Sequence, residues 1–422
     1  MAEQTLPLPG QATDTASGGG IYLRMAWRNL WRNRRRTWLT ASGIAFAIFL
    51  VSIGISFQAG SYSNMIDNAT GMFLGQMQIS HQDYVEDETL ENTVLDATAL
   101  LRQLRQDFAV KVAPRVQGFA LVSVGERSFG GLTVGVDFAA EQQVVNFFRN
   151  LKDGELPESA DEVLIGVTLA RNLGAAVGDE LVVLGTAKEG GVAALALTIS
   201  GTFRSGQPEL DRTLLFAPLA TVQNGFGLGD EIHQFVLRTD DLDSLEQTRQ
   251  AMEQALPEQL AVRAWPQLLP ELVQSIELDK ISARLMYGVI LILVTFSVVN
   301  TFLMIVFERT REFGMLLALG MRPGAIVSQV LLEASFMWVL GTTVGLLLSV
   351  AIIGYFAGAG VPLAGMEELA EQYYMSDRLY PGLSPEVFYV APVVLLVGTQ
   401  LAALVATFRI RRLQPVVALR AH

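Results

Sequence analysis

Side chains able to carry out catalysis or bind a metal are sparse in this sequence. The chain has no cysteine, and its histidines are far apart in the sequence: His81, His233 and His422. A zinc site needs three or four converging ligands, so we expect none. Acidic runs at 86–88 and 240–243 are typical of solvated loops, and Ser61 and Ser63 lack a nearby base or a nucleophile-elbow sequence. We therefore expect that the chain is not an enzyme.

A nucleotide-binding loop is also missing from the sequence. The pattern G-x-x-x-x-G-K-[ST], in which backbone amides and a lysine hold the phosphates, does not occur, and no Gly-Lys pair is present. We expect no cofactor in this chain. If its activity depends on ATP and Mg, a different subunit must bind them.

One short segment, ERTREFGMLLALG at 308–320, combines charge with apolar residues in a way that could transmit force. It is too short to cross a membrane and too apolar for a solvent-facing linker, so it should lie on the membrane surface or enter a groove in a partner. A glycine can end this helix, and Pro323 suits the first turn of the next one. The candidate contact residues are Glu308, Arg309, Arg311, Glu312, Phe313, Gly314, Leu316, Leu319 and Gly320.

Four apolar runs must position this segment. The chain is 51% hydrophobic and 17% charged, and the apolar residues are concentrated in runs of about 20 residues or more, enough to cross a hydrocarbon core of roughly 30 Å as a helix. We predict four transmembrane helices, at 38–58, 281–307, 323–356 and 388–408.

The distribution of basic residues predicts the orientation of these spans. Thirteen of the 30 lysines and arginines lie before the first span, in the 308–322 link and in the 409–422 tail, which places those segments in the cytoplasm. The region 59–280 and the loop 357–387 are then extracytoplasmic, although Lys280, Arg284 and Arg378 go against the rule. A cleaved signal peptide is the alternative for the first run, but that run is long and follows a polar 20-residue tail.

The N-terminal region is expected to form a tail and an anchor. Residues 1–20 lack apolar periodicity and are predicted to be disordered, whereas 21–37 form an amphipathic interfacial helix. Tryptophans favour the headgroup region and arginines the anionic leaflet, so contact with membrane lipids explains this helix, with a cytoplasmic subunit as an alternative partner. The anchor residues are Arg24, Trp27, Arg28, Trp31 and Arg32.

The extracytoplasmic region has the pattern of an α+β domain. Phe73–Ser80, a helix opened by Asp96 and Val110–Ala113 predict a strand–helix–strand unit, and 233–264 repeats that order. The region 116–229 between them has short apolar runs and Gly-rich turns, which indicates a mostly β insert with a helix at 167–173 closed by Gly174. The net acidity of 59–279, 32 acidic against 14 basic residues, gives no reason to expect nucleic acid as a partner.

Polar and small residues within the spans suggest helix contacts. Asn300 and Glu333 are the intramembrane polar residues, and Glu333, about 15 Å into the third span, needs a partner, for which Arg409 or Arg411 are candidates. Small residues spaced by four positions predict close helix packing. These pairs are Gly43 with Ala47, Gly341 with Gly345, and Gly354 with Gly358.

The run from Asn300 through Arg322-Pro323, the following Leu331-Leu332-Glu333 and the tail Arg409-I-R-R-L-Q-P-V-V-A-L-R together resemble the FtsX/MacB/LolC–LolE superfamily of permeases. The resemblance implies a type VII ABC transporter permease in which 308–320 is the coupling helix. It implies a second permease chain, as homodimer or heterodimer, and a cytoplasmic ATPase that binds ATP and Mg. It also implies a MacB-like periplasmic core, with a Porter-like part at 70–115 and 230–275 and a Sabre-like part at 116–229.

Because no ATPase domain is fused to this chain, the resemblance favours the LolC/LolE-like arrangement in the inner membrane. The implied function is mechanotransmission that extracts or exports lipoproteins or lipid-like substrates, passing them to a periplasmic carrier or adaptor. Two alternatives stay open: a tripartite efflux pump for drugs, peptides or toxins, and an FtsX-like regulator of a periplasmic hydrolase.

Overall fold

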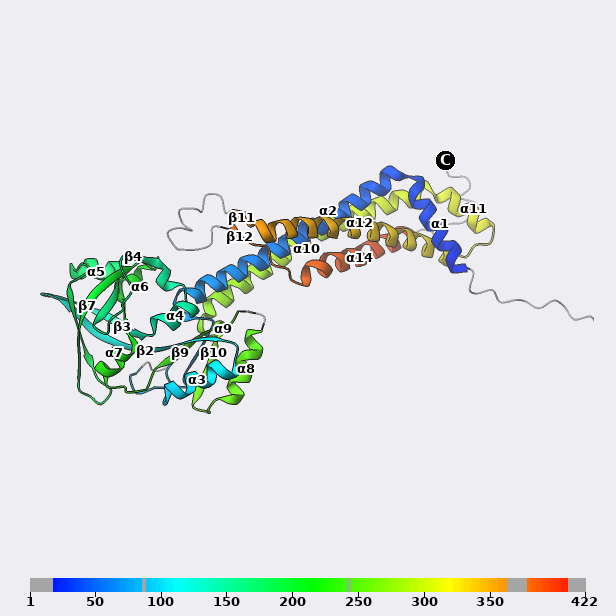
Figure 1. The fold of residues 1–422 in the computed structure, drawn as a ribbon. Coiled ribbons are helices and arrows are strands. Elements are labelled where there is room, and N and C mark those ends of the chain that lie inside the picture. Colours follow the sequence, from blue (N-terminus) through cyan, green and yellow to red (C-terminus); the bar gives the residue numbers. More distant parts are fainter. Residues whose placement is uncertain (1–17, 86–88, 241, 243, 363–377, 409–422) are drawn as a thin grey trace, which may run out of the picture. The chain divides into compact units, whose positions relative to one another are not determined.

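Long apolar helices form one of the two units of this computed structural model, which describes residues 18–85, 89–240, 242, 244–362 and 378–408. The helical unit comprises Met1–Ser61, Leu278–Val361 and Tyr380–His422, and the sheet unit Tyr62–Glu277 and Pro362–Leu379. The helical unit draws on α1 (Gly18–Arg32), α2 (Arg34–Ala69), α10 (Pro270–Glu308), α11 (Thr310–Ala318), α12 (Pro323–Ala359) and α14 (Glu386–Thr407) (Figure 1).

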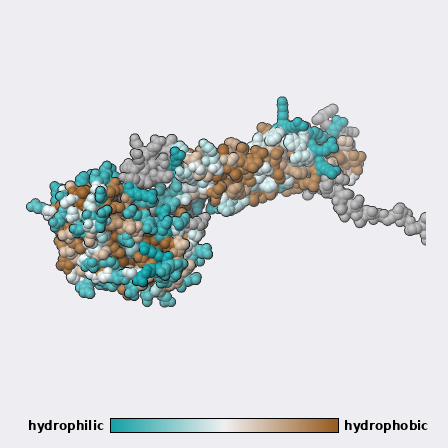
Figure 2. All heavy atoms as spheres, viewed as in Figure 1, coloured by the Kyte–Doolittle hydropathy of each residue, from teal (hydrophilic) through white to brown (hydrophobic). Residues whose placement is uncertain are grey.

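The four predicted spans are confirmed as helices long and apolar enough to cross a membrane, namely α2, α10, α12 and α14. Large apolar side chains remain exposed on them, among them Phe46, Leu285 and Phe296, each more than 60% exposed, and Figure 2 shows apolar residues over their outer surface. In water such a surface would be unfavourable, whereas acyl chains can cover it. The interfacial segment is two helices, because α1 ends at Arg32 and α2 begins at Arg34; the Oγ1 of Thr37 donates to the Leu30 carbonyl at this bend, at 2.6 Å.

Small residues bring α12 against α2. A Cβ on Gly341 would lie 2.7 Å from the Ile44 side chain, and one on Gly345 would lie 2.7 Å from the Ala45 carbonyl oxygen. The Gly341–Gly345 prediction is therefore confirmed. In the pair Gly43 with Ala47, Ala47 is completely buried in the core of the helical unit, as expected. The predictions for Gly43 and for the Gly354–Gly358 pair are wrong within the described part of the chain, because added Cβ atoms there would meet open space. The spacing of small residues identifies a flat strip on a helix, but it does not say whether a neighbour covers that strip.

The two ends of the sheet unit confirm the repeated strand–helix–strand order. The first copy is β1 (Met77–His81), α3 (Ala97–Asp107) and β2 (Lys111–Val124), and the second is β9 (Gln234–Arg238), α8 (Leu245–Ala255) and β10 (Leu260–Ala264). The strand order is β10-β1-β9-β2, with β9 antiparallel to both β1 and β2. Each copy is thus split by a strand of the other, as in a ferredoxin-like fold.

The insert continues the same sheet, which has ten described strands in the order β10-β1-β9-β2-β3-β8-β5-β7-β4, with β6 pairing with β2 and β7. Its helix α5 (Val167–Leu173) is confirmed, and Gly174 closes it in the left-handed conformation with φ of 70°. The other insert elements are β3 (Arg127–Val136), α4 (Phe138–Val144), η2 (Phe147–Asn150), β4 (Leu151–Gly154), β5 (Glu162–Gly166), β6 (Glu180–Thr186), β7 (Val192–Phe203), α6 (Pro208–Thr213), β8 (Leu214–Pro218) and α7 (Leu219–Phe226).

Three predicted local features of the sheet unit are wrong: the end of one strand, the start of another, and the helix cap at Asp96. The strand expected to end at Ala113 continues to Val124, so the division expected after Arg115 falls inside β2. The strand expected from Phe73 begins at Met77, after a π-helical turn η1 (Thr70–Leu74).

The side chain of Asp96 makes no capping hydrogen bond, and its φ is 50°. The carboxylate of Asp230 instead accepts from the backbone N–H of Thr98 at 3.3 Å and from its Oγ1 at 2.5 Å. The remaining short elements are α9 (Trp265–Leu268), β11 (Val361–Pro362) and β12 (Arg378–Leu379).

Two hydrophobic clusters cover the two faces of the sheet. On β9, Phe235 and Leu237 belong to one cluster and Val236 to the other, as the alternation of side chains along a strand requires. The second cluster includes an aromatic group around Phe147. The completely buried Arg115 and Glu141 form an ion pair, with the Arg115 Nε 2.7 Å from the Glu141 Oε1. Burial raises the pKa of Glu141 against the opposing effect of Arg115.

Candidate coupling site

The segment predicted to transmit force forms a separate helix. α10 ends at Glu308, Arg309 leaves the helical conformation, and α11 runs from Thr310 to Ala318. Gly320 has φ of 92°, and the backbone N–H of the next residue, Met321, donates to the Leu316 carbonyl at 3.0 Å. Glycine is suited to this left-handed position, so the predicted end of the helix is confirmed.

The two faces of α11 have different surroundings. Phe313 and Gly314 are buried, and Phe313 belongs to the hydrophobic core of the helical unit. Leu316 is partly buried, whereas Met315 is 52% and Leu319 is 79% exposed. The expectation that Phe313 contacts a partner protein is therefore wrong for this conformation, since its ring packs inside its own chain. Arg311 and the apolar side chains of Met315 and Leu319 remain available at the surface.

A buried ion pair fixes the start of α11 to α12. The Nη1 of Arg309 donates to both carboxylate oxygens of Glu333 at 3.0 Å, and the Nδ2 of Asn29 donates to Oε1 at 2.9 Å. Glu333 is 3% exposed. The partners expected for Glu333, Arg409 and Arg411, lie outside the described residues.

Glu333 lies ten residues after Pro323, the first residue of α12, as expected from the sequence, and its depth in a membrane stays a prediction. Its partner Arg309 follows the end of α10 directly, so Glu333 is level with the end of that helix to within the length of an arginine side chain.

Further ion pairs connect the same segment to the N-terminal helices. The Nη2 of Arg32 donates to both oxygens of Glu312 at 2.8 and 3.0 Å, and the Nε of Arg309 donates to Glu312 Oε2 at 3.0 Å. Burial alone would raise the pKa of Glu312, but the hydrogen bonds from Arg32 and Arg309 lower it overall. Together these groups line a cavity of about 240 Å³. We call this set the ionic junction: Asn29, Arg32, Arg36, Glu308, Arg309, Glu312 and Glu333.

Three residues of the ionic junction, Asn29, Arg32 and Arg36, are not predicted from the sequence to contact the 308–320 segment. Arg32 was expected to anchor the chain to lipid, and Asn29 and Arg36 were not singled out. Arg36 donates to Glu308. The sequence does contain a signal for these contacts. Residues 24–36 are rich in arginine, and the 308–320 segment, predicted on the same side of the membrane, carries two glutamates of opposite charge.

The predicted anchor residues gather around aromatic contacts. The ring of Trp27 lies 5.8 Å from that of Trp31 and 5.5 Å from that of Phe336 on α12, and Trp31 lies 6.4 Å from Trp38. Arg24 and Arg28 are exposed. The aromatic cluster thus ties α1 to the bundle as well as presenting tryptophans at its surface, and the lipid contact stays a prediction.

The other intramembrane polar residue, Asn300, is exposed on α10 and has no hydrogen-bond partner among the described residues. Its neighbours on the same face are apolar and exposed, with Phe296 at 66% and Met304 at 55%. A carboxamide in such a position would be left without partners in acyl chains.

Histidines do not converge in the described part of the chain, and no group of three or more metal-ligating side chains occurs there. His233 is buried, its Nδ1 accepts from the Gln117 backbone N–H at 2.9 Å, and its ring stacks on Tyr84. Burial and then the nearby Lys188 lower its pKa to about 4. His422 lies outside the described residues.

Comparisons with known proteins agree with this architecture. Residues 37–255 match the MacB-like periplasmic core domain, and 284–415 match the FtsX-like permease C-terminal domain. The chain therefore belongs to the family of FtsX-like and MacB-like permeases, a type VII ABC permease superfamily, with four candidate membrane helices and a large α/β domain of periplasmic type.

Relatives with curated names fall into two groups. The lipoprotein-releasing system transmembrane protein LolC of Neisseria meningitidis serogroup B is 23% identical over 81% of this chain and 84% of its own length. The macrolide export ATP-binding/permease protein MacB of Mannheimia succiniciproducens is 25% identical over 77% of this chain but only 51% of its own length. Among solved structures, the periplasmic region of MacB from Actinobacillus actinomycetemcomitans is similar at 17% identity, with a TM-score of 0.34 over 49% of this chain and 94% of that one.

Proposed function

We propose that this chain is the non-enzymatic permease subunit of an ABC transporter, driven by a separate cytoplasmic ATPase subunit that binds ATP and Mg. The observation that carries this proposal is the division of α11 into two faces. One face is buried and its start is held by the Arg309–Glu333 pair, while Met315 and Leu319 are exposed beside Arg311. Exposed apolar side chains on a short helix suit insertion into a groove of a partner.

The ionic junction supports a mechanism of transmission. A displacement of α11 by the ATPase would act on α12 through Glu333 and on α1 through Arg32, since both residues are ion-paired to the segment around Arg309 and Glu312. α10 is one unbroken helix of 39 residues, about 58 Å long, so movement at its cytoplasmic end would reach its extracytoplasmic end. Such coupling needs two states that the partner binds with different affinity.

For cargo, we propose lipoproteins or other lipid-like molecules of the inner membrane, handed to a periplasmic carrier or adaptor. The support is that the LolC relatives match along most of their length, whereas the MacB relatives are about twice as long as the matched region. Macrolide-type efflux in a tripartite pump is the second candidate, because MacB relatives match nearly as much of this chain. The arginines of the ionic junction support placing it, and both termini, on the cytoplasmic side.

A second permease chain is proposed to pack against the Asn300 face of α10. The amide of Asn300 would gain a hydrogen-bond partner there, and interhelical side-chain amides are effective contacts within a bilayer. In a symmetric dimer the same residue of the second copy could supply that partner.

The ATPase contact is tested with Leu319→Asp, compared with Val192→Asp. Val192 is a similarly exposed apolar residue, 81% against 79%, at the start of β7 in the sheet unit. The tagged full chain is purified from its own host, and the co-purified ATPase and its hydrolysis rate are measured. We expect Leu319→Asp to reduce bound ATPase at least about tenfold while the chain stays in the membrane, because an acid would be placed in an apolar contact. Equal ATPase recovery in the two variants would reject α11 as the coupling helix.

The dimer contact is tested by cysteine cross-linking, which needs no background mutations because the chain has no cysteine. Asn300→Cys should form a covalent dimer on mild oxidation in the membrane, whereas Leu347→Cys, on an exposed position of α12, should not. A second permease chain of different sequence that co-purifies, while Asn300→Cys stays monomeric because that chain supplies no cysteine opposite it, would indicate a heterodimer. Cross-linking of Leu347→Cys alone would place the interface elsewhere.

The cargo is tested by identifying what the nucleotide-free complex retains. Acylated protein or phospholipid that leaves on ATP addition would support lipoprotein or lipid transport. Release of a macrolide or peptide, with no acylated species, would support the efflux alternative.

A further inference from the structure

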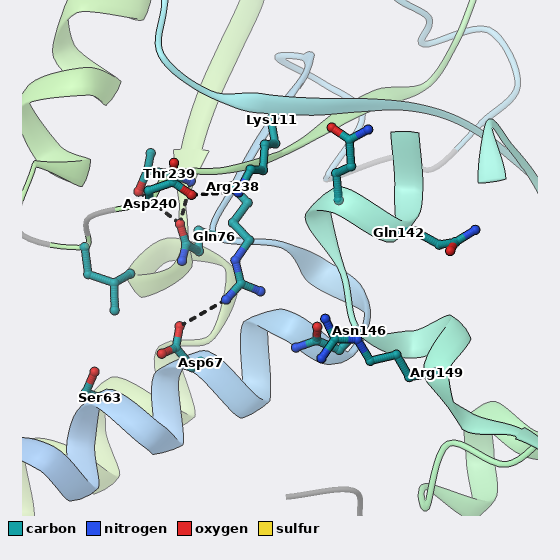
Figure 3. A pocket seen from close by; sticks show the side chains of 12 residues that line it. Ser63, Asp67, Gln76, Lys111, Gln142, Asn146, Arg149, Arg238, Thr239 and Asp240 are labelled. Carbon is teal, nitrogen blue, oxygen red and sulfur yellow. Dashed lines mark hydrogen bonds and ion pairs between the residues drawn. The ribbon is translucent and has the colours of Figure 1, made fainter. Parts of the chain in front are cut away.

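A polar cavity of about 610 Å³ opens in the sheet unit, and the proposed coupling mechanism does not use it (Figure 3). Its walls come from the end of α2, from residues at β1, β2 and β9, and from α4 and η2 (Figure 3). Only one of its twelve lining residues, Leu242, is apolar. Such a lining does not suit an acyl chain, and the size is within the range of small-molecule sites.

The charges of the polar cavity leave one cation without an acidic partner. Asp240 is 2.7 Å from the Nζ of Lys111, and Asp67 is 3.8 Å from the Nη2 of Arg238. Arg149 also lines the cavity, is exposed, and forms no ion pair among the described residues. The lining therefore carries a net charge of +1, in a domain that is otherwise strongly acidic. Because the net negative charge of the domain repels an anion at long range, this site would have to bind an anion through direct hydrogen bonds and ion pairs.

Donor groups of the lining converge near Gly71. A Cβ built on this glycine would lie 3.1 Å from Asn146 Nδ2 and 3.6 Å from Arg238 Nη1, so both donors border the space that a side chain would fill. The backbone N–H of Asn146 donates to the Gly71 carbonyl at 2.7 Å and holds the residue in place.

A buried amide adds a further donor. Gln76 is 3% exposed, and its Oε1 accepts from the backbone N–H and the Oγ1 of Thr239, at 2.8 and 3.1 Å. These bonds set the orientation of the carboxamide, and its Nε2 is turned away from Thr239 (Figure 3).

We propose that this polar cavity binds the phosphate group of a phosphate ester, with Arg149 and Arg238 as charged donors and Asn146 as a neutral donor. The planar guanidinium group presents paired N–H donors that match phosphate oxygens, and such charge-assisted bonds are stronger than neutral ones. The cavity is larger than a bare phosphate needs, and its polar lining suits the hydroxyl groups of an ester such as glycerol phosphate. The ester could be the head group of an anionic lipid or a soluble metabolite.

Calorimetric titration of the full chain in maltoside micelles distinguishes these sources. One arm uses glycerol 3-phosphate, and the other uses dihexanoyl phosphatidylglycerol below its micellar concentration, with glycerol as the uncharged control. Binding of both esters means that the phosphate group suffices, and binding of the lipid alone assigns the site to a lipid head group. Binding of neither ester overturns the proposal. No ATPase is present, so the result is independent of the coupling mechanism.

Variants of the lining identify the donors. Arg149→Gln should weaken binding at least about tenfold, the loss expected for a charge-assisted hydrogen bond. Arg171→Gln, which removes the same charge from an exposed position outside the cavity, should change it less than about twofold. Gly71→Ala places a methyl group among the donors without changing charge and should also weaken binding. Equal affinities of wild type and Arg149→Gln, or equal losses for Arg149→Gln and Arg171→Gln, would overturn the assignment.

Discussion

Breaking the Arg309–Glu333 pair should destabilise the helical unit strongly, because both side chains are almost fully buried, at 12% and 4% exposure. Removing one partner of a buried ion pair costs about 3–5 kcal/mol, since the other charge stays buried without compensation. Arg309 keeps a second partner, Glu312, at 3.0 Å, so Glu333→Leu should cost about 2–3 kcal/mol. Arg309→Met leaves Glu333 with only Asn29 and should cost about 3–5 kcal/mol.

The double variant Arg309→Met with Glu333→Leu should lose much less than the sum of the single losses. Two apolar side chains can replace a buried ion pair at a net cost of about 1 kcal/mol or less, which predicts a coupling free energy of at least about 4 kcal/mol. The pair Arg36–Glu308 provides the control, because its carboxylate is 46% exposed and Glu308→Gln there should cost much less than either loss at the buried pair.

The assay is equilibrium unfolding in detergent micelles, followed by tryptophan fluorescence. Four of the five tryptophans lie in the helical unit, at positions 27, 31, 38 and 338, so the signal reports on that unit. Purely additive losses in the double variant would refute the coupling of the two charges. Single losses no larger than that of Glu308→Gln would refute the claim that the pair is buried in the folded protein.

Two further predictions concern packing and pH. In the same unfolding assay, Gly345→Ala should destabilise the protein by about 1–3 kcal/mol, because its Cβ would lie 2.7 Å from a backbone oxygen of α2. The control Gly358→Ala faces open space and should be neutral or stabilising. The pKa of His233 is about 4 in the folded protein against 6.5 for a free side chain, so the unfolded chain binds the proton more readily between those values. The contribution of His233 to the free energy of unfolding of the sheet unit should therefore stay constant above pH 7 and fall by about 3 kcal/mol as the pH drops from 6.5 to 4, and this fall should be absent in His233→Gln. An unchanged stability of Gly345→Ala, or an equal pH slope in His233→Gln, would contradict these two arguments.

The sequence predicted the spans and most of the sheet elements because their signals are local. An apolar run of about 20 residues or more with at most one charge predicts a membrane helix, and a short apolar run such as Leu260–Ala264 predicts a strand, in each case without knowledge of the rest of the chain. Their ends were less predictable. α2 continues to Ala69, and no proline interrupts the polar residues that follow Phe57. Gly60, within this extension, packs closely against Tyr380.

Features that depend on the fold could not be predicted in this way. The strand expected to end at Ala113 continues as β2 through Pro114 and Gly118. At Pro114, β2 pairs only with β9, and the pairing with β3 begins at the next residue, Arg115. The N–H that proline lacks is therefore not needed for a hydrogen bond to β3. Similarly, the apolar pattern of 308–320 predicted a helix, but it could not show that Phe313 faces the chain's own core.

The candidate site was predicted only in its position along the chain. The segment 308–320 was identified, but the ionic junction brings together residues more than 270 positions apart, such as Arg32 and Glu312. A single sequence provides no pairing information over such distances. Matching opposite charges between predicted cytoplasmic segments would have suggested several pairs, among them the correct ones.

The unusual length of β2 determines how the sheet unit can respond to load. Its 14 residues, about 45 Å of extended chain, pair with β9 at one end and with β3 and β6 further along. A hinge between the ferredoxin-like half and the insert would have to break or bend this shared strand. The sheet unit should therefore move as one rigid body. Its ferredoxin-like half and its insert should not open relative to each other about a hinge.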